Sequence, residues 1–156
     1  MVGLAAGCSS GRTDKAGAAP ALVERSRVSM GSELHLTAWT SDEAMAVAAF
    51  ESVFAEFDRL DGLMSVWREG SDIVRLNAAA GVSPVSVSRE TREVLLDAQR
   101  ISEWTNGKFD VTFGALSGLW KFDQDQDGTV PSRAAVEAKL PLIDYTKLVV
   151  DERAGT

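Results

Sequence analysis

The sequence predicts an α+β fold in which helices pack against a largely antiparallel sheet. Hydrophobic residues alternate with polar ones between Val28 and Ala38, which is the two-residue period of a half-buried strand. Two later stretches, residues 40–64 and 89–106, instead repeat their apolar residues at helical spacing. With 156 residues and 45% hydrophobic content, the chain is long enough for one domain with a sizeable core.

Two segments are predicted to be strands. In the first, Gly31-Ser32 interrupts the alternation, and we expect a single strand with a break, because glycine permits a bulge or a close backbone approach. The second is Leu148–Val150, which enters a turn over residues 151–155. A strand that ends without a pairing partner is costly, so we expect this sequence to be the N-terminal piece of a longer protein.

The first predicted helix begins with a capping-box pattern, Thr40 followed by Glu43. Its apolar stripe consists of Phe50, Val53, Phe54, Phe57, Leu60 and Met64. Burying a Phe side chain contributes about 1.5 to 3 kcal/mol. We therefore expect truncation of Phe54 or Phe57 to damage folding first.

Ser88 is placed to cap the second long helix, Arg89–Asn106, whose apolar face holds Val94, Leu95, Ala98, Ile101 and Trp104. Gly107 stands where a helix that ends in left-handed geometry needs a residue without a Cβ. Further short helices are expected over residues 71–77, 114–120 and 131–140, and an extended segment over residues 82–87.

The amino-terminal residues indicate a membrane anchor. Leu4-Ala5-Ala6-Gly7-Cys8 resembles the lipobox of bacterial lipoproteins, in which the cysteine is acylated after cleavage. The alternative for Cys8 is an inert small side chain. We interpret residues 1–8 as a truncated lipoprotein signal, residues 9–26 as a flexible tether rich in Ser, Gly and Ala, and residues 27–156 as the folded part.

Charge and composition exclude several classes of protein. The net charge of -7 argues against nucleic-acid binding, which relies on clustered Lys and Arg. The only histidine is His35, and on that ground we expect neither a His-based metal site nor a Ser-His-Asp triad. Asp123-x-Asp125-x-Asp127-Gly128 fits the first half of a calcium loop, but Ala134 stands where the loop needs a bidentate Glu, which favours a solvated loop.

Two clusters combine the residue types of a binding site. One is Met64-Ser65-Val66-Trp67-Arg68, followed by Ser71 and Leu76-Asn77. The other is Gly107-Lys108-Phe109-Asp110-Val111-Thr112-Phe113-Gly114, followed by Leu119-Trp120 and Phe122. In this order they resemble the FAD:protein FMN transferases, the ApbE-type flavin transferases of bacteria. The likeness runs from about Val28 to Gly155 and implies the same α+β fold.

The resemblance implies a reaction and a set of ligand contacts. FMN would move from FAD to a threonine hydroxyl of a target flavoprotein, AMP would leave, and Mg²⁺ would offset the developing charge. Met30, Trp67, Lys108, Phe109 and Asp110 match the positions that contact FAD, with Trp67 where most members carry Tyr. The ligands for Mg²⁺ are expected downstream of Thr156, and no catalytic residue is identified.

Each of these contacts also has a structural interpretation. Met30 can be core filler, Trp67 can close the end of a helix, Lys108 can point to water, and Asp110 can cap the turn after Gly107. The rival to a lipid-anchored transferase on the extracytoplasmic face of the membrane is a non-catalytic flavin-binding or scaffold lipoprotein. A calcium-stabilised surface module is a third, weaker possibility.

Overall fold

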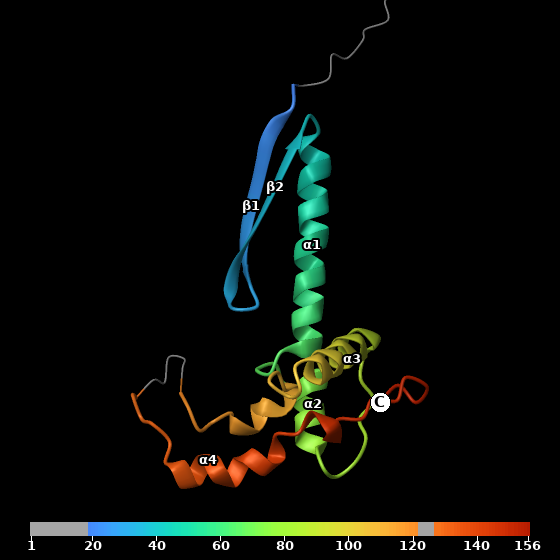
Figure 1. Cartoon of the computed structure of the whole chain (residues 1–156). Coiled ribbons are helices and arrows are strands. Elements are labelled where there is room, and N and C mark those ends of the chain that lie inside the picture. The colour runs from blue at the N-terminus through green and yellow to red at the C-terminus, as the bar shows by residue number, and fades with distance from the viewer. Residues whose placement is uncertain (1–18, 122–126) are drawn as a thin grey trace, which may run out of the picture. The chain divides into compact units, whose positions relative to one another are not determined.

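The computed structural model describes residues 19–121 and 127–156, shown in Figure 1. The chain divides into two compact units, one up to Arg59 and one from Leu60 onward, and each is described by itself. Strands and helices together make the α+β class that the sequence predicts. Within the described ranges, none of the helices has the length and hydrophobicity needed to span a bilayer.

The first unit begins with an antiparallel hairpin of β1 (Ala21–Ser29) and β2 (Ser32–Thr40). The prediction of a single interrupted strand was wrong, because the chain reverses at Met30 and Gly31. Their φ values of 49° and 79° are both positive, as a two-residue hairpin turn of type I′ requires. Reversal also changes which positions face inward, so Val28 and Met30 are exposed while Leu34 and Leu36 pack against the core.

The folded part starts earlier than predicted. Ala21 to Ser26 were assigned to the flexible tether, but they form most of β1 and pair with the residues from Thr40 back to His35. Composition misled the prediction because this stretch carries three polar or charged residues and buries only Val23. A stretch with one buried apolar side chain has almost no hydrophobic periodicity to detect.

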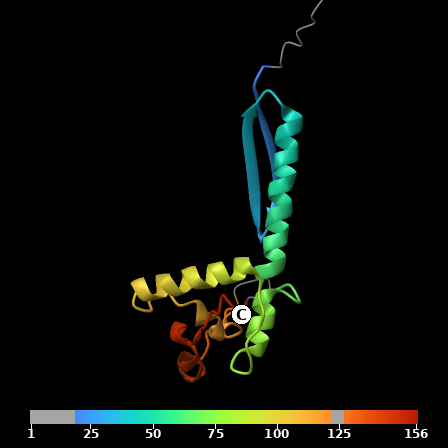
Figure 2. The ribbon, with the colours of Figure 1, turned by 90° about the vertical axis from the view of Figure 1, so that its right-hand side faces the viewer.

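Helix α1 (Glu43–Met64) follows β2, and Figure 2 shows the hairpin lying along it. Asp42, rather than Thr40, caps the helix, since its carboxylate accepts a hydrogen bond from Met45 N at 2.9 Å. The predicted aromatic stripe is confirmed in part, with Phe50 and Phe54 buried and Phe57 half-buried. The core of this unit contains Val23, Ala46, Phe50 and Phe54, with Leu34, Leu36, Ala38 and Val47 packed against it.

The second unit is helical. Its elements are α2 (Asp72–Ala79), α3 (Arg89–Trp104), the 3-10 helix η1 (Val111–Leu116), α4 (Arg133–Lys139) and the short turns η2 (Leu140–Leu142) and η3 (Tyr145–Lys147). Ser88 caps α3 as predicted, accepting a hydrogen bond from Thr91 N at 3.2 Å. Ser132 likewise caps α4, and Ser71 caps α2.

The buried face of α3 differs from the predicted one. Thr91, Leu95, Ala98 and Ser102 are buried, whereas Val94, Ile101 and Trp104 are exposed. Of the five predicted stripe residues, only Leu95 and Ala98 are buried, and the small polar residues Thr91 and Ser102 complete the buried face. Such a mixed face carries a weaker hydrophobic signal than the exposed residues beside it.

The predicted strand Leu148–Val150 is not formed, because no other segment among residues 19–121 and 127–156 pairs with it. A hydrogen bond of 2.6 Å from Gln99 Nε2 to Leu148 O ties it to α3 instead. The turn that follows is confirmed, with the Asp151 carboxylate accepting hydrogen bonds from Arg153 N and Ala154 N at 2.9 and 3.0 Å.

Candidate nucleotide site

The first cluster forms a tight loop between α1 and α2, residues 65–70, which we call the Trp67 loop. Trp67 is 82% exposed, so the expectation that it closes the helix by packing is not met. Its backbone is nevertheless tied, since Trp67 N donates to Ser65 Oγ at 3.2 Å and Arg68 Nε pairs with Asp61 Oδ2 at 2.6 Å. An exposed indole on a fastened backbone is suited to stacking on a ring.

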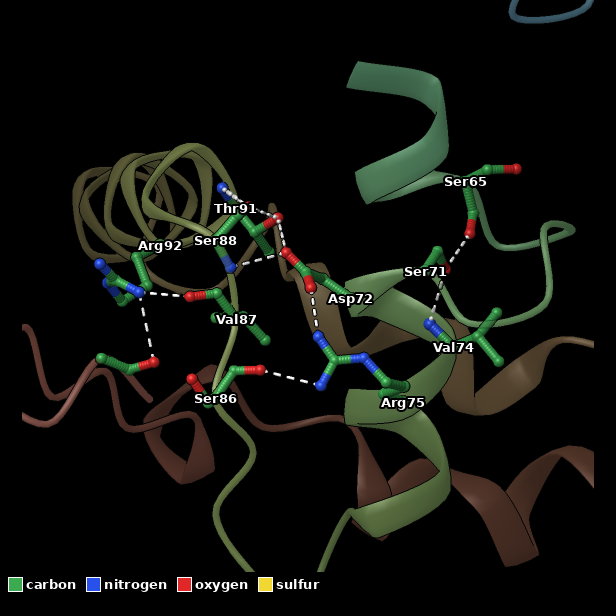
Figure 3. Close-up of polar contacts among 11 residues, drawn as sticks. Ser65, Ser71, Asp72, Val74, Arg75, Ser86, Val87, Ser88, Thr91 and Arg92 are labelled. Atoms are coloured by element: carbon green, nitrogen blue, oxygen red, sulfur yellow. Dashed lines mark hydrogen bonds and ion pairs between the residues drawn. The ribbon is translucent and has the colours of Figure 1, made fainter. Parts of the chain in front are cut away.

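Ser71 closes this loop, as Figure 3 shows. Its hydroxyl donates a hydrogen bond to Ser65 O at 2.6 Å and accepts one from Val74 N at 3.1 Å. One side chain therefore joins the two ends of the Trp67 loop and caps α2. The serine of the sequence motif has this structural explanation.

Asp72 connects α2 to the start of α3. Its Oδ2 accepts hydrogen bonds from Ser88 N at 2.7 Å and from Thr91 Oγ1 at 2.8 Å, and its Oδ1 pairs with Arg75. Burial by itself raises the pKa of Asp72, but the hydrogen bonds from Ser88, Thr91 and Arg75 outweigh it and hold the pKa below its ordinary value. The residue is thus an ionised, fully partnered link inside the second unit.

The second cluster follows the carboxyl end of α3. Gly107 N donates to Ser102 O at 2.8 Å and Asn106 N donates to Glu103 O at 3.1 Å, the paired bonds of a Schellman motif. Asn106 and Gly107 have φ of 52° and 73°, so the predicted left-handed turn is confirmed. Beyond it, Phe109 is 41% exposed and the ammonium of Lys108 has no hydrogen bond or ion pair to any described residue.

The carboxylate of Asp110 is already engaged within the chain. Its Oδ1 accepts hydrogen bonds from Thr112 N and Thr112 Oγ1 at 2.8 and 2.6 Å, and its Oδ2 accepts one from Tyr145 N at 2.9 Å. Asp110 therefore caps η1 and holds the turn at Tyr145, which is the capping role that the sequence left open. Each carboxylate oxygen can accept more than one hydrogen bond, so a ligand contact stays a prediction.

These two clusters lie at opposite ends of α3. The Trp67 loop is attached through Ser71 and Asp72 to the first turn of the helix, whereas Lys108–Asp110 follows its last turn. A helix of 16 residues is about 24 Å long. A single ring cannot touch both clusters, but an extended dinucleotide has a ring system at each end.

Met30 belongs to the first unit and lies at the tip of the hairpin, 50% exposed. Its φ of 49° is uncommon for a side chain other than glycine, Asn or Asp. Exposure argues against the alternative of core filler. The type I′ turn accounts for this φ, so a ligand contact at Met30 stays a prediction from the resemblance.

The described residues contain no group of three or more His, Cys, Asp and Glu that could hold a metal ion. Asp123 and Asp125 of the calcium-like pattern lie outside the described residues, as does Cys8. Asp127 is described, and its Oδ2 pairs with the Lys121 ammonium at 2.8 Å, a hydrogen bond that lowers the pKa of the carboxyl. An aspartate already paired with a lysine agrees with a solvated loop.

The inference from the single histidine was incomplete. A Ser, a His and a Glu do meet on the outer face of the hairpin, with Ser26 Oγ 2.6 Å from His35 Nδ1 and His35 Nε2 3.5 Å from Glu24 Oε1. His35 and Glu24 side chains are each about half exposed, on a two-stranded surface. The trio is an exposed cross-strand contact.

A family model described as the ApbE family matches residues 30–156. The chain belongs to the ApbE family. A protein of Klebsiella pneumoniae named FAD:protein FMN transferase is 35% identical over 153 residues, which cover 97% of this chain and 43% of that relative. A Salmonella typhimurium protein of the same name is 27% identical over 139 residues, 88% of this chain and 40% of the relative. This ApbE-family chain thus spans less than half the length of these curated relatives.

Solved ApbE structures share the fold. The apo form of the Pseudomonas stutzeri flavinyl transferase ApbE superposes with a TM-score of 0.74 at 26% identity, over 85% of this chain and 43% of that one. The ApbE protein of Thermotoga maritima gives a TM-score of 0.74 at 24% identity over the same shares. The resemblance read from the two motif clusters is therefore confirmed at the level of family and fold.

Sequence reasoning missed the residues that hold the clusters in place. Asp72, Thr91 and Tyr145 were not singled out. Tyr145 N donates a hydrogen bond to Asp110, and Thr91 Oγ1 donates one to Asp72, which follows Ser71 of the first cluster. Asp72 follows an N-cap serine, where an acidic residue is favourable in any exposed helix. Nothing in the local pattern shows that this particular carboxylate is buried.

Proposed function

We propose that this chain carries the amino-terminal part of the nucleotide site of an FAD:protein FMN transferase. The enzyme transfers FMN from FAD to a threonine hydroxyl of a target flavoprotein and releases AMP. The observation that carries this proposal is the 35% identity to a transferase of that name along 97% of the chain, motif clusters included. The indole of Trp67 supports it, since at 82% exposed it is accessible to a ring system of a bound nucleotide.

The chain's own residues bind and orient FAD in this proposal. Trp67 stacks on one ring system, and stacking of this kind contributes roughly 1 to 3 kcal/mol. Phe109 and the backbone of Lys108 contact the nucleotide at the other end of α3, where the unpaired ammonium of Lys108 can meet a phosphate. Asp110 orients the segment that precedes η1, and a contact from Met30 is predicted by the resemblance alone.

Mg²⁺ is part of the proposed reaction, where it would offset charge on the pyrophosphate. The described residues do not fit a magnesium site, because they provide no cluster of three acidic or other ligating side chains. The resemblance places the ligands in sequence beyond Thr156. The rival is a family member that binds flavin without transferring it, and it differs from the transferase in lacking those downstream ligands.

Labelling of a target protein distinguishes these two functions. The complete protein is incubated with FAD, Mg²⁺ and a target that presents a threonine in a Ser/Thr-rich sequence. The transferase yields a flavin-fluorescent band on the target that survives a denaturing gel, and a Thr→Val target stays dark. FAD binding without such a band identifies the non-catalytic alternative. If the protein does not bind FAD and also gives no labelled band, the flavin assignment is refuted.

We also propose that Cys8 is lipidated and anchors the enzyme to the extracytoplasmic face of the cell membrane. The support is the lipobox-like sequence Leu4–Cys8 and the Ser, Gly and Ala-rich segment that follows it. Cells fed a radiolabelled fatty acid should label the wild-type protein in the membrane fraction. A Cys8→Ala variant that keeps the label and the membrane location would contradict this anchor.

A further inference from the structure

Ser71 and Asp72 are buried neighbours to which the proposed flavin chemistry gives no task. Their exposed fractions are only 2% and 4%. Keeping an ionised carboxylate buried is costly unless hydrogen bonds satisfy it. The arrangement of those bonds therefore shows what the pair does.

Ser71 does more than cap a helix. An N-cap hydroxyl ordinarily accepts one backbone hydrogen bond, which here comes from Val74 N. The same hydroxyl also donates to Ser65 O at 2.6 Å, and Ser71 N donates to Arg68 O at 3.2 Å. The first and fourth residues of the Trp67 loop are thus both bonded to Ser71.

Asp72 extends this attachment to α3. It accepts hydrogen bonds from Ser88 N, the backbone of the α3 N-cap, and from Thr91 Oγ1, a side chain that is 1% exposed. Ser88 Oγ and Thr91 Oγ1 are also bonded at 2.9 Å. Figure 3 shows the resulting run of contacts from Ser65 through Ser71 and Asp72 to the amino end of α3.

We propose that Ser71 and Asp72 are positioning residues for nucleotide binding. They fix the Trp67 loop to one end of α3, so that Trp67 and the Lys108–Asp110 segment at the other end are set at a constant spacing before FAD arrives. This inference rests on the proposed function. If the loop adopts its binding conformation only part of the time, the apparent Kd for FAD rises by the inverse of the fraction of time spent in that conformation. Loss of the attachment should therefore weaken FAD binding and leave the rate of the chemical step unchanged.

The test compares two serine N-caps in the complete protein. Ser71→Ala removes the cap of α2 together with the bond to Ser65 O. Ser132→Ala is the matched control, because Ser132 caps α4 through Ala135 N at 3.2 Å and is exposed. We expect Ser71→Ala to raise the KM for FAD about tenfold with kcat within about twofold of wild type, while Ser132→Ala changes neither.

Further variants separate positioning from general loss of structure. Ser71→Thr keeps a hydroxyl that can cap and donate, and it should restore the wild-type KM. Asp72→Asn keeps the shape and one acceptor oxygen but loses the ion pair to Arg75, so its KM for FAD should rise. Asp97→Asn is its control, because it removes an exposed ion pair with Arg100 on α3, and its KM for FAD should not change. Amide hydrogen exchange should speed up over residues 65–71 in Ser71→Ala while the middle of α3 stays protected.

The outcomes distinguish this inference from the proposed function. Faster exchange in the Trp67 loop with an unchanged KM for FAD would overturn the positioning role while leaving flavin transfer intact. A fall in kcat at constant KM would overturn it as well, because the pair would then act on the reaction rather than on binding. A wild-type protein that neither binds FAD nor labels a target refutes the proposed function, and the positioning role with it.

Discussion

Replacing Trp67 with alanine separates a binding role for this residue from a structural one. Trp67 is 82% exposed, so its removal takes almost no apolar area out of the interior. Exposed substitutions of this kind usually change the free energy of unfolding by less than about 0.5 kcal/mol. The melting temperature of Trp67→Ala should therefore equal that of the wild type.

Binding should respond far more strongly. An aromatic platform contributes roughly 1 to 3 kcal/mol per stacked ring, and about 1.4 kcal/mol corresponds to a factor of ten. Loss of the indole should therefore raise the KM for FAD between about five and 150-fold. Trp67→Tyr keeps a ring and adds the hydroxyl that most family members are expected to have, so it should stay close to wild type.

The assay is a titration of FAD in the target-labelling reaction, with melting curves measured on the same preparations. Trp39→Ala is the matched control, because Trp39 is 72% exposed on the outer face of β2. If Trp67→Ala leaves the KM for FAD within twofold of wild type in an active enzyme, the indole does not contact the nucleotide. A large loss of melting temperature would show instead that it is a packing residue.

Three further predictions concern the framework. Phe54→Ala empties a site that is 2% exposed and removes the ring beneath the Arg27 guanidinium, 4.6 Å away, so chemical denaturation should show a loss of about 3 to 5 kcal/mol. Because the pKa of Asp72 is lowered in the fold, its carboxylate stabilises the protein above the unfolded pKa, about 4, and this stabilisation disappears as the pH falls through the lower, folded pKa. Asp72→Asn should thus lower the melting temperature at pH 7 and much less in strong acid; an equal loss at both would contradict the ionised link. Gly107→Ala should lower the free energy of unfolding by roughly 1 to 2 kcal/mol, because the φ of Gly107 is 73°. Gly62→Ala inside α1 is the control and should stabilise the protein. If the two variants have equal denaturation midpoints, the left-handed assignment is refuted.

The helices were predictable because their signals are local. Ser88, Ser132 and Gly107 each stand where a helix begins or ends for a reason contained in a few neighbouring residues. Phe50 and Phe54 repeat at the spacing that one packed face requires. The hairpin was missed because the signal of its turn is Met30-Gly31 rather than Asn-Gly, and because β1 has little apolar alternation.

The candidate site was predictable only as a set of motif residues. Resemblance identifies Trp67 and Asp110, but their surroundings depend on contacts between segments far apart in the sequence. Asp110 reaches Tyr145 across 35 positions, and Asp72 reaches Thr91 across 19. Such pairs leave no periodic pattern in one sequence, so the capping role of Asp110 and the burial of Asp72 emerge only from the fold.

The hairpin has a practical consequence for handling this protein. β1 and β2 are nine residues each and pair only with one another among the described residues, so each presents an open outer edge. Open edges recruit other strands, and a two-stranded ribbon resists this poorly. Preparations of these residues alone should self-associate as the concentration rises, and a lysine or proline introduced at an outward edge position is the direct remedy.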